Sequence, residues 1–452
     1  MIKFILWNKW SLLQCNDPKV IRTFSDFLSY KVNGRFTKNG NDTVSLLTKK
    51  NAFKTGFFPL IYNLLKDNYE ISVQDNRTNL FYITEVDYTL PIGELRDNQI
   101  DCVKAFFASK GWYRGIINAA TNYGKNWVIT SILKNLAPYT NVVITVHRTE
   151  LFEQLYEMFT SCGLEVSLYG TLGKESYKNL GKITLLMPTS VGEEVLSSNF
   201  ALHMKSVGAL IVDECHRATA KEYMRVLSLI DAFAVCYLSG TPYTDNPNHD
   251  LNVIGDSGHE IFKITNKDLI DEGISQRPTV VIHTIHRRDY SIDYDEEKQS
   301  IITCEERLQI IKDYILADLD KVILIPVAVK DHGHYLYREL SSLPTTVDFI
   351  YSGDPHRRKK LSDYKDGKIK VLISTEVLKE GVNIPNINIL INAAWGKSVV
   401  WVKQFVGRLL RHDGISSECL VVDFIDPGQN TKQHSYQRLE RYTAESFEII
   451  QK

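Results

Sequence analysis

The chain lacks paired cysteines. Its seven cysteines stand singly, and none belongs to a C-x-x-C pair. Zinc sites and disulfide frameworks depend on such spacing, so the sequence predicts neither. Free thiols and the lack of a secretory signal sequence favour a cytoplasmic protein, in a host cytoplasm if the chain is viral.

A long apolar run and a strong net charge are also missing. The apolar start at residues 1–9 is far shorter than the roughly 20 residues of a membrane span, so no membrane partner is expected. The net charge of −1 gives no global attraction to nucleic acid, so a surface that binds it must be local. A chain of 452 residues without internal repeats is too long for one core, and two to four domains are expected.

Residues 1–88 are predicted to form a small α+β domain. Strands are expected at 4–6 and 71–73, and a helix at 57–65 with Pro59 in its first turn. Basic side chains outnumber the single acid Asp42 in the middle of this segment; they are Lys31, Arg35, Lys38, Lys49, Lys50 and Lys54. This excess fits a phosphate-binding surface and an ordinary solvated surface about equally well.

Residues 89–298 are predicted to hold a first sheet domain and a polar linker. Its apolar strands lie at 115–117, 141–146, 182–186, 209–212 and 234–238. Continuous runs of this kind are typical of parallel strands that are covered on both faces.

Residues 299–452 are predicted to form a second domain of the same kind. Its strands are expected at 321–325, 347–350, 370–373, 388–391 and 420–424. The predicted fold class is therefore α/β, with two tandem parallel-sheet domains after a small α+β domain. Ligands of such sheets bind beyond the carboxyl ends of the strands, where the motifs below fall.

One segment has the composition of a phosphate-binding loop; it reads Thr121, Asn122, Tyr123, Gly124, Lys125 and Asn126. Gly124 lets the backbone approach phosphates closely, and Lys125 can reach their outer oxygens. Asn126 stands where the usual loop has the Ser or Thr that helps to hold Mg²⁺, and Ala119 stands in place of its first glycine. Taken alone, the segment fits a plain turn as well.

Two adjacent carboxylates, Asp213 and Glu214, follow the apolar run 209–212. Beside bound phosphates, Asp213 offers the oxygen ligand that Mg²⁺ prefers, and Asn126 offers a second. Glu214 can orient and deprotonate a water molecule. An ordinary loop acid is the alternative, which two acids followed by His216 fit poorly. The loop and the acids together predict binding and hydrolysis of a nucleoside triphosphate.

Two further segments extend this pattern. Ser239 and Thr241 follow another strand, and their hydroxyls can bond the carboxylates or a neighbouring domain, although the segment alone is a turn. Gln404, Arg408 and Arg411 share one face of a helix, at spacings of four and three. Such arginines can stabilise the charge that develops on a transferred phosphate, and surface ion pairing is the alternative.

In their order along residues 91–426, these segments resemble the helicases of superfamily 2. The matched segments are 95–99 for adenine reading, 121–126 for motif I, 146–151 for motif Ia, 188–190 for the next nucleic-acid motif, 213–216 for a DECH form of motif II, 239–241 for motif III, 374–376 with 380–385 for motif V, and 404–411 for motif VI. Asn383 departs from the Asp that is usual in motif V.

The resemblance implies two RecA-like domains that bind ATP and Mg²⁺. It gives catalytic roles to Lys125, Asp213, Glu214, Gln404, Arg408 and Arg411, and nucleotide binding to Arg96, Gln99 and 121–126. It gives nucleic-acid contacts to Arg148, Thr189 and Thr375, and coupling to Ser239, Thr241 and Gly381. The metal ligands would be Asp213 and Asn126.

Residues 53–58 and 69–77 resemble the small N-terminal domain of phage UvsW-like helicases, which act on branched DNA in the manner of RecG. This implies a monomeric ATP-dependent DNA helicase or translocase whose partners are single-stranded DNA and branched or duplex DNA. The alternatives are an RNA helicase, the motor subunit of a DNA-cleaving complex, and a binding module whose ATPase is inactive because of Asn126.

The first prediction concerns Lys125. Lys125→Ala removes the charge that reaches the outer phosphates, so we expect DNA-stimulated ATP hydrolysis to be lost while DNA binding is largely kept. Phosphate release and fluorescence anisotropy of labelled DNA measure the two properties separately. Full turnover by this variant would remove the phosphate assignment.

Overall fold

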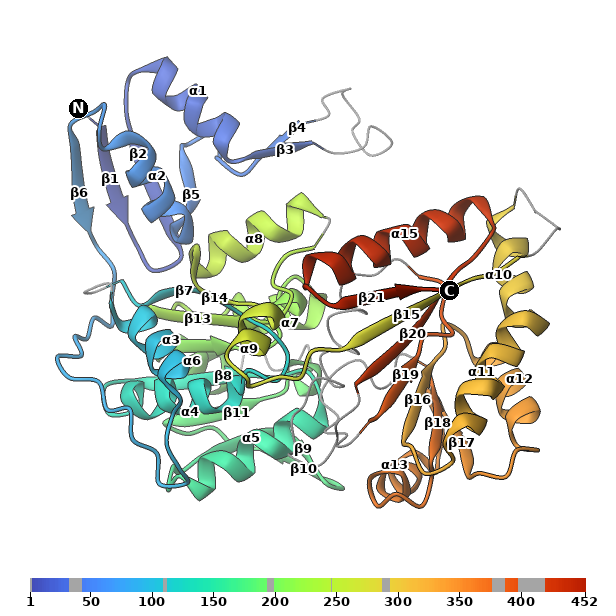
Figure 1. The fold of residues 1–452 in the computed structure, drawn as a ribbon. Helices are drawn as coiled ribbons and strands as arrows, with labels where there is room; N and C mark the ends of the chain where they lie inside the picture. Colours follow the sequence, from blue (N-terminus) through green and yellow to red (C-terminus); the bar gives the residue numbers. More distant parts are fainter. Residues whose placement is uncertain are drawn as a thin grey trace. The chain divides into compact units, whose positions relative to one another are not determined.

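A computed structural model describes residues 2–31, 43–108, 112–192, 199–244, 246–286, 293–375, 387–396 and 419–452. They form two compact units. The first consists of Met1–Ala119 and Gly124–Lys263, and the second of Ala120–Tyr123 and Ile264–Lys452. The first unit holds the N-terminal domain and one large sheet, and the second unit holds another (Figure 1).

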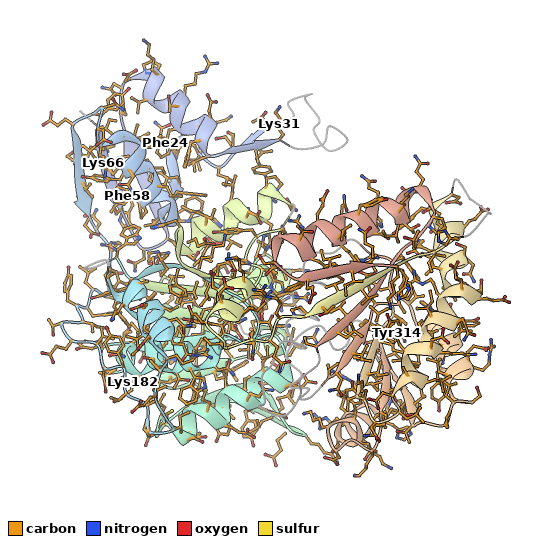
Figure 2. All side chains as sticks on the ribbon, viewed as in Figure 1. Phe24, Lys31, Phe58, Lys66, Lys182 and Tyr314 are labelled. Atoms are coloured by element: carbon orange, nitrogen blue, oxygen red, sulfur yellow. The ribbon has the colours of Figure 1, made fainter. Side chains whose placement is uncertain are left out.

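The N-terminal domain is a four-stranded sheet with helices packed on an aromatic core. Its sheet has the order β5-β2-β1-β6, with bounds Ala52–Lys54, Trp10–Gln14, Ile2–Leu6 and Ile71–Asp75. The other elements are α1 (Pro18–Phe27), the hairpin strands β3 (Ser29–Lys31) and β4 (Thr43–Ser45), the 3₁₀ turn η1 (Thr55–Phe57) and α2 (Phe58–Leu65). Phe24 packs edge-on against Phe53 at 5.1 Å, while Lys31 and Lys66 lie on the outside (Figure 2). The predicted strands 4–6 and 71–73 and the predicted helix are confirmed.

The first unit's large sheet is mostly parallel. In the order β10-β9-β11-β8-β12-β13-β7-β14, its strands are Glu175–Lys178, Ser167–Leu172, Ile183–Leu186, Asn141–Thr145, Val207–Val212, Ala234–Ser239, Arg114–Ala119 and Glu260–Ile264. The pairs from β9 to β7 in this order are parallel, and β10 is antiparallel to β9. All five predicted strands are confirmed, whereas β9, β10 and β14 are not predicted from the sequence.

Helices cover this sheet because its strands are apolar on both faces. They are α3 (Asp97–Ala108), α4 (Lys125–Leu136), α5 (Thr149–Ser161), α6 (Asn199–Lys205), α7 (Lys221–Leu227) and α8 (Pro247–Ser257), with the 3₁₀ turns η2 (Pro188–Ser190) and η4 (Cys215–Arg217). Phe200 of α6, Tyr223 of α7 and Val253 of α8 pack in one core with Leu210 and Val235 of the strands. Alternate strand residues therefore face these three helices.

The N-terminal domain and the large sheet share a buried polar contact around Arg114. The Arg114 guanidinium is 2% exposed and donates to the carbonyls of Asn8 at 2.9 Å, Ala232 at 3.1 Å and Asp256 at 2.7 Å. Burial lowers the pKa of Arg114 to about 10. These bonds tie Arg114 of β7 to the turn after β1, to the segment before β13 and to α8.

The second unit is built on a seven-stranded sheet. In the order β17-β18-β16-β19-β20-β15-β21, its strands are Val347–Ile350, Val371–Ser374, Ile323–Pro326, Ile389–Ile391, Leu420–Ile425, Thr279–Thr284 and Glu448–Gln451, and neighbouring strands are parallel. The helices are α9 (Asn266–Asp271), α10 (Tyr294–Ile302), α11 (Glu305–Ala317), α12 (Lys330–Leu340), α13 (Arg357–Lys365) and α15 (Gln429–Ala444). Side chains of α11 and α12 pack on one face, and those of α13 and α15 on the other. The predicted α/β class with two parallel-sheet domains is confirmed.

One strand differs from the sequence prediction. Residues 279–284 fall within the segment 89–298 that is assigned to the first domain and its linker, but they form β15 in the second unit's sheet. Val280, Val281 and Ile282 supply an apolar run that pairs in register with β20. Because polar residues follow this short run after residue 286, the sequence alone does not identify it as a strand.

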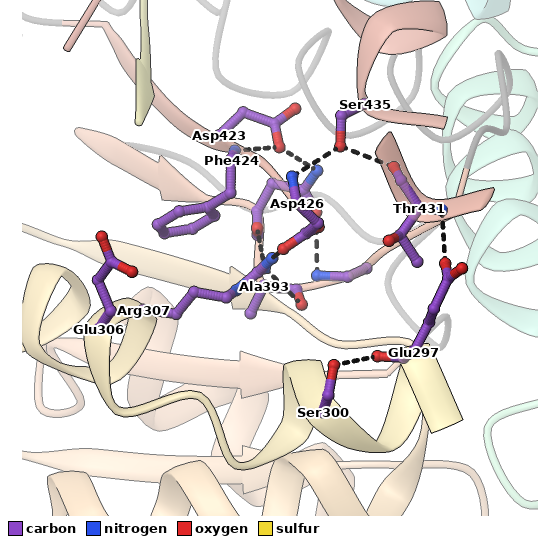
Figure 3. A network of polar contacts seen from close by, with 12 residues as sticks. Glu297, Ser300, Glu306, Arg307, Ala393, Asp423, Phe424, Asp426, Thr431 and Ser435 are labelled. Carbon is purple, nitrogen blue, oxygen red and sulfur yellow. Dashed lines mark hydrogen bonds and ion pairs between the residues drawn. The ribbon is translucent and has the colours of Figure 1, made fainter. Parts of the chain in front are cut away.

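A buried polar network supports the second sheet (Figure 3). The Arg438 guanidinium donates to both oxygens of the Asp423 carboxylate at 2.9 Å, and Arg307 pairs with Asp426. Glu297 of α10 accepts the backbone N–H groups of Asn430 and Thr431 in the first turn of α15. Because each buried charge has an opposite partner or several donors, the network tolerates burial that a lone charge would not.

The second prediction follows from the Arg114 contact. Deleting residues 1–88 removes the Asn8 carbonyl and also Phe81, whose ring lies 5.6 Å from that of Tyr113 and 5.3 Å from that of Phe233. Uncovering large apolar side chains costs roughly 1.5–3 kcal/mol each, so we expect the melting temperature to fall by roughly 5 °C or more. Scanning calorimetry of the two chains tests this. An unchanged melting temperature would show that the N-terminal domain is an independent attachment.

Candidate nucleotide site

The predicted phosphate loop follows β7 and leads directly into α4. Asn122 has φ 75° and Gly124 has φ 84°, so two residues of the loop are left-handed. A Cβ at Gly124 would lie 2.7 Å from Nε2 of Gln99, so the Gln99 side chain would have to move, and the positive φ of Gly124 itself favours glycine. Gly124 is the N-cap of α4, so the positive end of the helix dipole lies at the loop.

The predicted adenine segment lies beside Gly124. Gln99 is 3% exposed, and its side-chain oxygen accepts the backbone N–H of Arg96 at 3.0 Å. The same hypothetical Cβ at Gly124 would lie 3.5 Å from Nη2 of Arg96. The structure therefore brings Arg96, Gln99 and the loop glycine together. Asn122 donates to the hydroxyl of Ser275 at 3.0 Å, and Tyr123 is buried.

The two carboxylates stand at the carboxyl end of β12. Asp213 is 2% exposed, and its Oδ1 has no hydrogen-bond partner among the described residues. Burial and the neighbouring charge of Glu214 raise the pKa of Asp213 to about 6, and Lys125 opposes the rise. Nζ of Lys125 lies 3.8 Å from Oε1 of Glu214 and 3.5 Å from the carbonyl of Ala119. Lysine, aspartate and glutamate therefore form one cluster.

Glu214 is held in a defined orientation. Its backbone is left-handed at φ 50°, which a residue other than glycine adopts only when its surroundings fix it. The Ser239 hydroxyl donates to Oε2 of Glu214 at 3.1 Å and accepts the backbone N–H of Thr241 at 3.0 Å. Nδ1 of His216 lies 3.3 Å from the same carboxylate oxygen and 3.1 Å from the Ser239 hydroxyl. The sequence does not indicate this contact of His216 beyond its place two residues after Glu214.

These residues fit a nucleoside triphosphate with Mg²⁺. Asp213 presents a buried acceptor oxygen that has no partner within the part of the chain that the structure describes, which suits a hard cation. Lys125 and the first turn of α4 present positive charge and N–H groups, which suit phosphate. Asn126 lies in the same turn as Lys125, and its role as a second metal ligand stays a prediction.

The predicted nucleic-acid contacts lie on several elements. Arg148 caps α5 and donates from Nε to the His147 ring at 3.1 Å, and Thr189 is exposed in η2. Both follow parallel strands of the first sheet. Thr375 follows β18 in the second unit, is 8% exposed and donates its N–H to Ile350 at 3.2 Å. Their contacts with nucleic acid stay predictions.

Four predicted residues lie outside the described part of the chain; they are Gly381, Gln404, Arg408 and Arg411. Their roles therefore stay as the sequence predicts them.

Known families match both sheet domains. Residues 92–244 match the type III restriction enzyme res subunit family, and residues 296–413 match the helicase conserved C-terminal domain. Through these two matches the chain is similar to the superfamily 2 helicases. Members of this superfamily are ATP-driven nucleic-acid helicases, and the two matched domains are those that carry the motifs described above.

Individual superfamily 2 relatives are distant. The chain is 26% identical to the putative mitochondrial ATP-dependent helicase irc3 of Schizosaccharomyces pombe, over 75% of this chain and 59% of irc3. It thus spans about three fifths of that relative. It is 25% identical to the ATP-dependent DNA helicase uvsW of phage T4, over 75% of this chain and 74% of uvsW.

Similarity to a solved structure is evidence for the fold and for nothing further. Dbp5 of S. cerevisiae, bound to RNA and ADP·BeF3, matches with a TM-score of 0.57 at 13% identity and covers 79% of this chain and 90% of Dbp5. Among the helices in the described ranges, none combines the length and the apolar character needed to cross a membrane.

The third prediction uses the raised pKa of Asp213. Its pKa of about 6 lies above the ordinary 3.8, so the buried carboxylate destabilises the nucleotide-free fold at pH values above about 6, and the cost fades as the pH falls toward 3.8. Asp213→Asn should therefore raise the melting temperature by roughly 2–4 °C at pH 7.5 and by less at pH 4.5. Differential scanning fluorimetry in EDTA measures both.

Asp423→Asn is the matched control, because Asp423 is equally buried but paired with Arg438. It should lower the melting temperature, since it leaves a buried guanidinium without its partner. A pH-independent effect of Asp213→Asn would contradict the charge argument.

Proposed function

We propose that this protein is an ATP-dependent DNA helicase or translocase that unwinds or branch-migrates forks and junctions. The observation that carries the proposal is the cluster of Lys125, Asp213 and Glu214 beside the loop 121–126, in which Gly124 has a positive φ. Such a cluster is suited to hydrolysis of a nucleoside triphosphate. The choice of branched DNA rests on the likeness to uvsW and on the N-terminal domain that precedes the motor.

In this proposal ATP and Mg²⁺ occupy the cluster. The residues that would hold the nucleotide are Arg96, Gln99, Thr121, Asn122, Tyr123, Gly124, Lys125 and Asn126, with Asp213 and Asn126 toward the cation. Bound Mg²⁺ neutralises phosphate charge. Glu214 is the general base, and its carboxylate, which Ser239 and His216 hold in place, would orient a water molecule.

The second unit completes the proposed mechanism. Gln404, Arg408 and Arg411 would bring positive charge to the transferred phosphate, and loss of such an arginine typically costs about 10³-fold or more in rate. Ser239, Thr241 and Gly381 would couple hydrolysis to movement along nucleic acid. Ser239 already bonds Glu214, which supports this role for the hydroxyl.

DNA would be held mainly through its phosphates. Arg148, Thr189 and Thr375 are the proposed backbone contacts, because cations and hydroxyls bind phosphate without reading sequence. On the N-terminal domain, Lys31, Lys49, Lys50 and Lys66 are exposed and offer the positive charge that a duplex or junction needs. We propose that the active species is a monomer in the cytoplasm.

An RNA substrate is the second candidate. Dbp5, which shares the fold, is described in complex with RNA, and the motor motifs do not separate the two nucleic acids. A motor subunit of a DNA-cleaving complex is the third, since one matched family is a restriction subunit.

The fourth prediction compares substrates. ATP hydrolysis is measured with a forked DNA, a linear duplex, a single strand and an RNA fork of equal length, with Lys125→Ala as the blank. We expect the forked DNA to give the highest kcat/KM, by roughly tenfold over linear duplex, which is the discrimination that about 1.4 kcal/mol supplies. Gel analysis of the same reactions detects strand separation and cleavage. Preference for the RNA fork, or cleaved DNA, would replace the proposal with one of the other two candidates.

A further inference from the structure

Helix α8 contacts the carboxylate loop through its first turn. Nε2 of His249 lies 2.9 Å from the carbonyl of His216, and because a carbonyl only accepts, Nε2 carries the hydrogen. Nδ1 of His249 lies 3.0 Å from Oδ1 of Asp250, which also accepts the backbone N–H of Thr244 at 2.7 Å. The first turn of α8 thus holds the segments that follow both β12 and β13.

The rest of α8 forms part of the N-terminal domain's interior. Leu251 and Ile254 pack against the core of that domain. Nζ of Lys54 on β5 pairs with Asp256 at 2.7 Å and donates to the side chain of Asn252 at 3.0 Å.

The backbones of α8 and the N-terminal domain meet at a glycine. A Cβ at Gly56 would overlap the carbonyl oxygens of Ile254 and Gly255, which are backbone atoms that cannot turn aside. One face of the same helix, through Val253, is fully buried in the core of the large sheet. The N-terminal domain therefore cannot shift on the sheet without moving α8, because close-packed interiors transmit displacement.

This contact bears directly on Glu214. His216, whose carbonyl His249 holds, places its ring against Oε2 of Glu214 and the Ser239 hydroxyl. A shift of α8 would move the His216 backbone and, through its ring, the partners that orient the carboxylate.

We propose that α8 couples the N-terminal domain to ATP hydrolysis, with His249 as the residue that positions His216 and hence Glu214. Nucleic acid bound to the N-terminal domain would change the rate of ATP hydrolysis through this helix. The proposal rests on the proposed function for its substrate, but its structural part concerns only the chain's own residues.

The fifth prediction removes the bond at His249. In His249→Phe the His216 carbonyl loses its donor, so we expect kcat for DNA-stimulated ATP hydrolysis to fall about tenfold with little change in KM, as is typical when a residue that orients a site residue is lost. His249→Gln should restore part of the rate, because its amide N–H can donate. His356→Phe, which replaces an exposed histidine of the second unit, is the matched control and should behave as the wild-type chain.

The same variants are examined without nucleotide by hydrogen–deuterium exchange. The backbone of residues 213–217 should exchange faster in His249→Phe than in the wild-type chain and in His249→Gln. Unchanged exchange there, together with unchanged kcat, would overturn the positioning role. A lower melting temperature with normal kcat would mean that His249 only stabilises the fold.

Gly56→Ala tests the other end of the helix. Its methyl group must push β5 and η1 away from α8, so we expect faster exchange at both 52–57 and 213–217 and a kcat reduced in the same sense as in His249→Phe. The double variant should be no slower than the slower single variant, because both act through one element. If Gly56→Ala does not fold, Lys54→Met breaks the ion pair with Asp256 and takes its place.

Faster exchange confined to 52–57, with normal exchange at 213–217, would overturn the coupling. A wild-type chain whose ATP hydrolysis ignores all nucleic acids would instead contradict the proposed function, and the exchange measurement would still decide the structural link.

Discussion

The buried carboxylate of Asp213 is the constraint on which the rest of the site depends. Asp213 directly follows β12, which is buried along its whole length, so its side chain lies at the carboxyl end of the sheet, where one of its oxygens has no hydrogen-bond partner among the described residues. Proteins rarely leave such a group unsatisfied, because no hydrogen bond then offsets the free energy that its desolvation costs. Lys125 offsets part of the charge, and the first turn of α4 adds its positive end. A bound cation would therefore satisfy this carboxylate, and the loop beside it is suited to the phosphates that accompany such a cation.

A second buried aspartate of the same chain, Asp423, differs from Asp213 in its hydrogen-bond partners. Asp423 is as deeply buried as Asp213, yet its carboxylate accepts hydrogen bonds from Arg438, Asn392 and the Tyr442 hydroxyl. There the buried charge is satisfied by the protein and serves the fold. Among the described residues no donor reaches Oδ1 of Asp213, which is the pattern expected of a group that binds a ligand. The N-terminal domain also belongs to this site's surroundings, because it shares its interior with the sheet that presents Asp213.

Much of the fold is predictable from the sequence, because continuous apolar runs such as 209–212 and 234–238 can be read as buried parallel strands. The strands that escape prediction are short or flanked by polar residues, as β15 and β21 are, and only their pairing partners make them strands. The site is predictable to the level of motifs, since the loop and the two acids lie at strand ends. The contacts of His216 and His249 are not predictable, because they join residues brought together by α8 rather than by spacing along the chain. The roles given to Gln404, Arg408 and Arg411 rest on sequence alone.

The most direct measurement is the affinity for ATP with and without Mg²⁺, determined by isothermal titration calorimetry on the wild-type chain and on Asp213→Asn. If the bare oxygen of Asp213 is a cation ligand, Mg²⁺ should tighten ATP binding by roughly tenfold or more in the wild-type chain, about 1.4 kcal/mol, and should have little effect in the variant. An equal gain from Mg²⁺ in both chains would contradict the account, because the buried carboxylate would then have no part in holding the nucleotide.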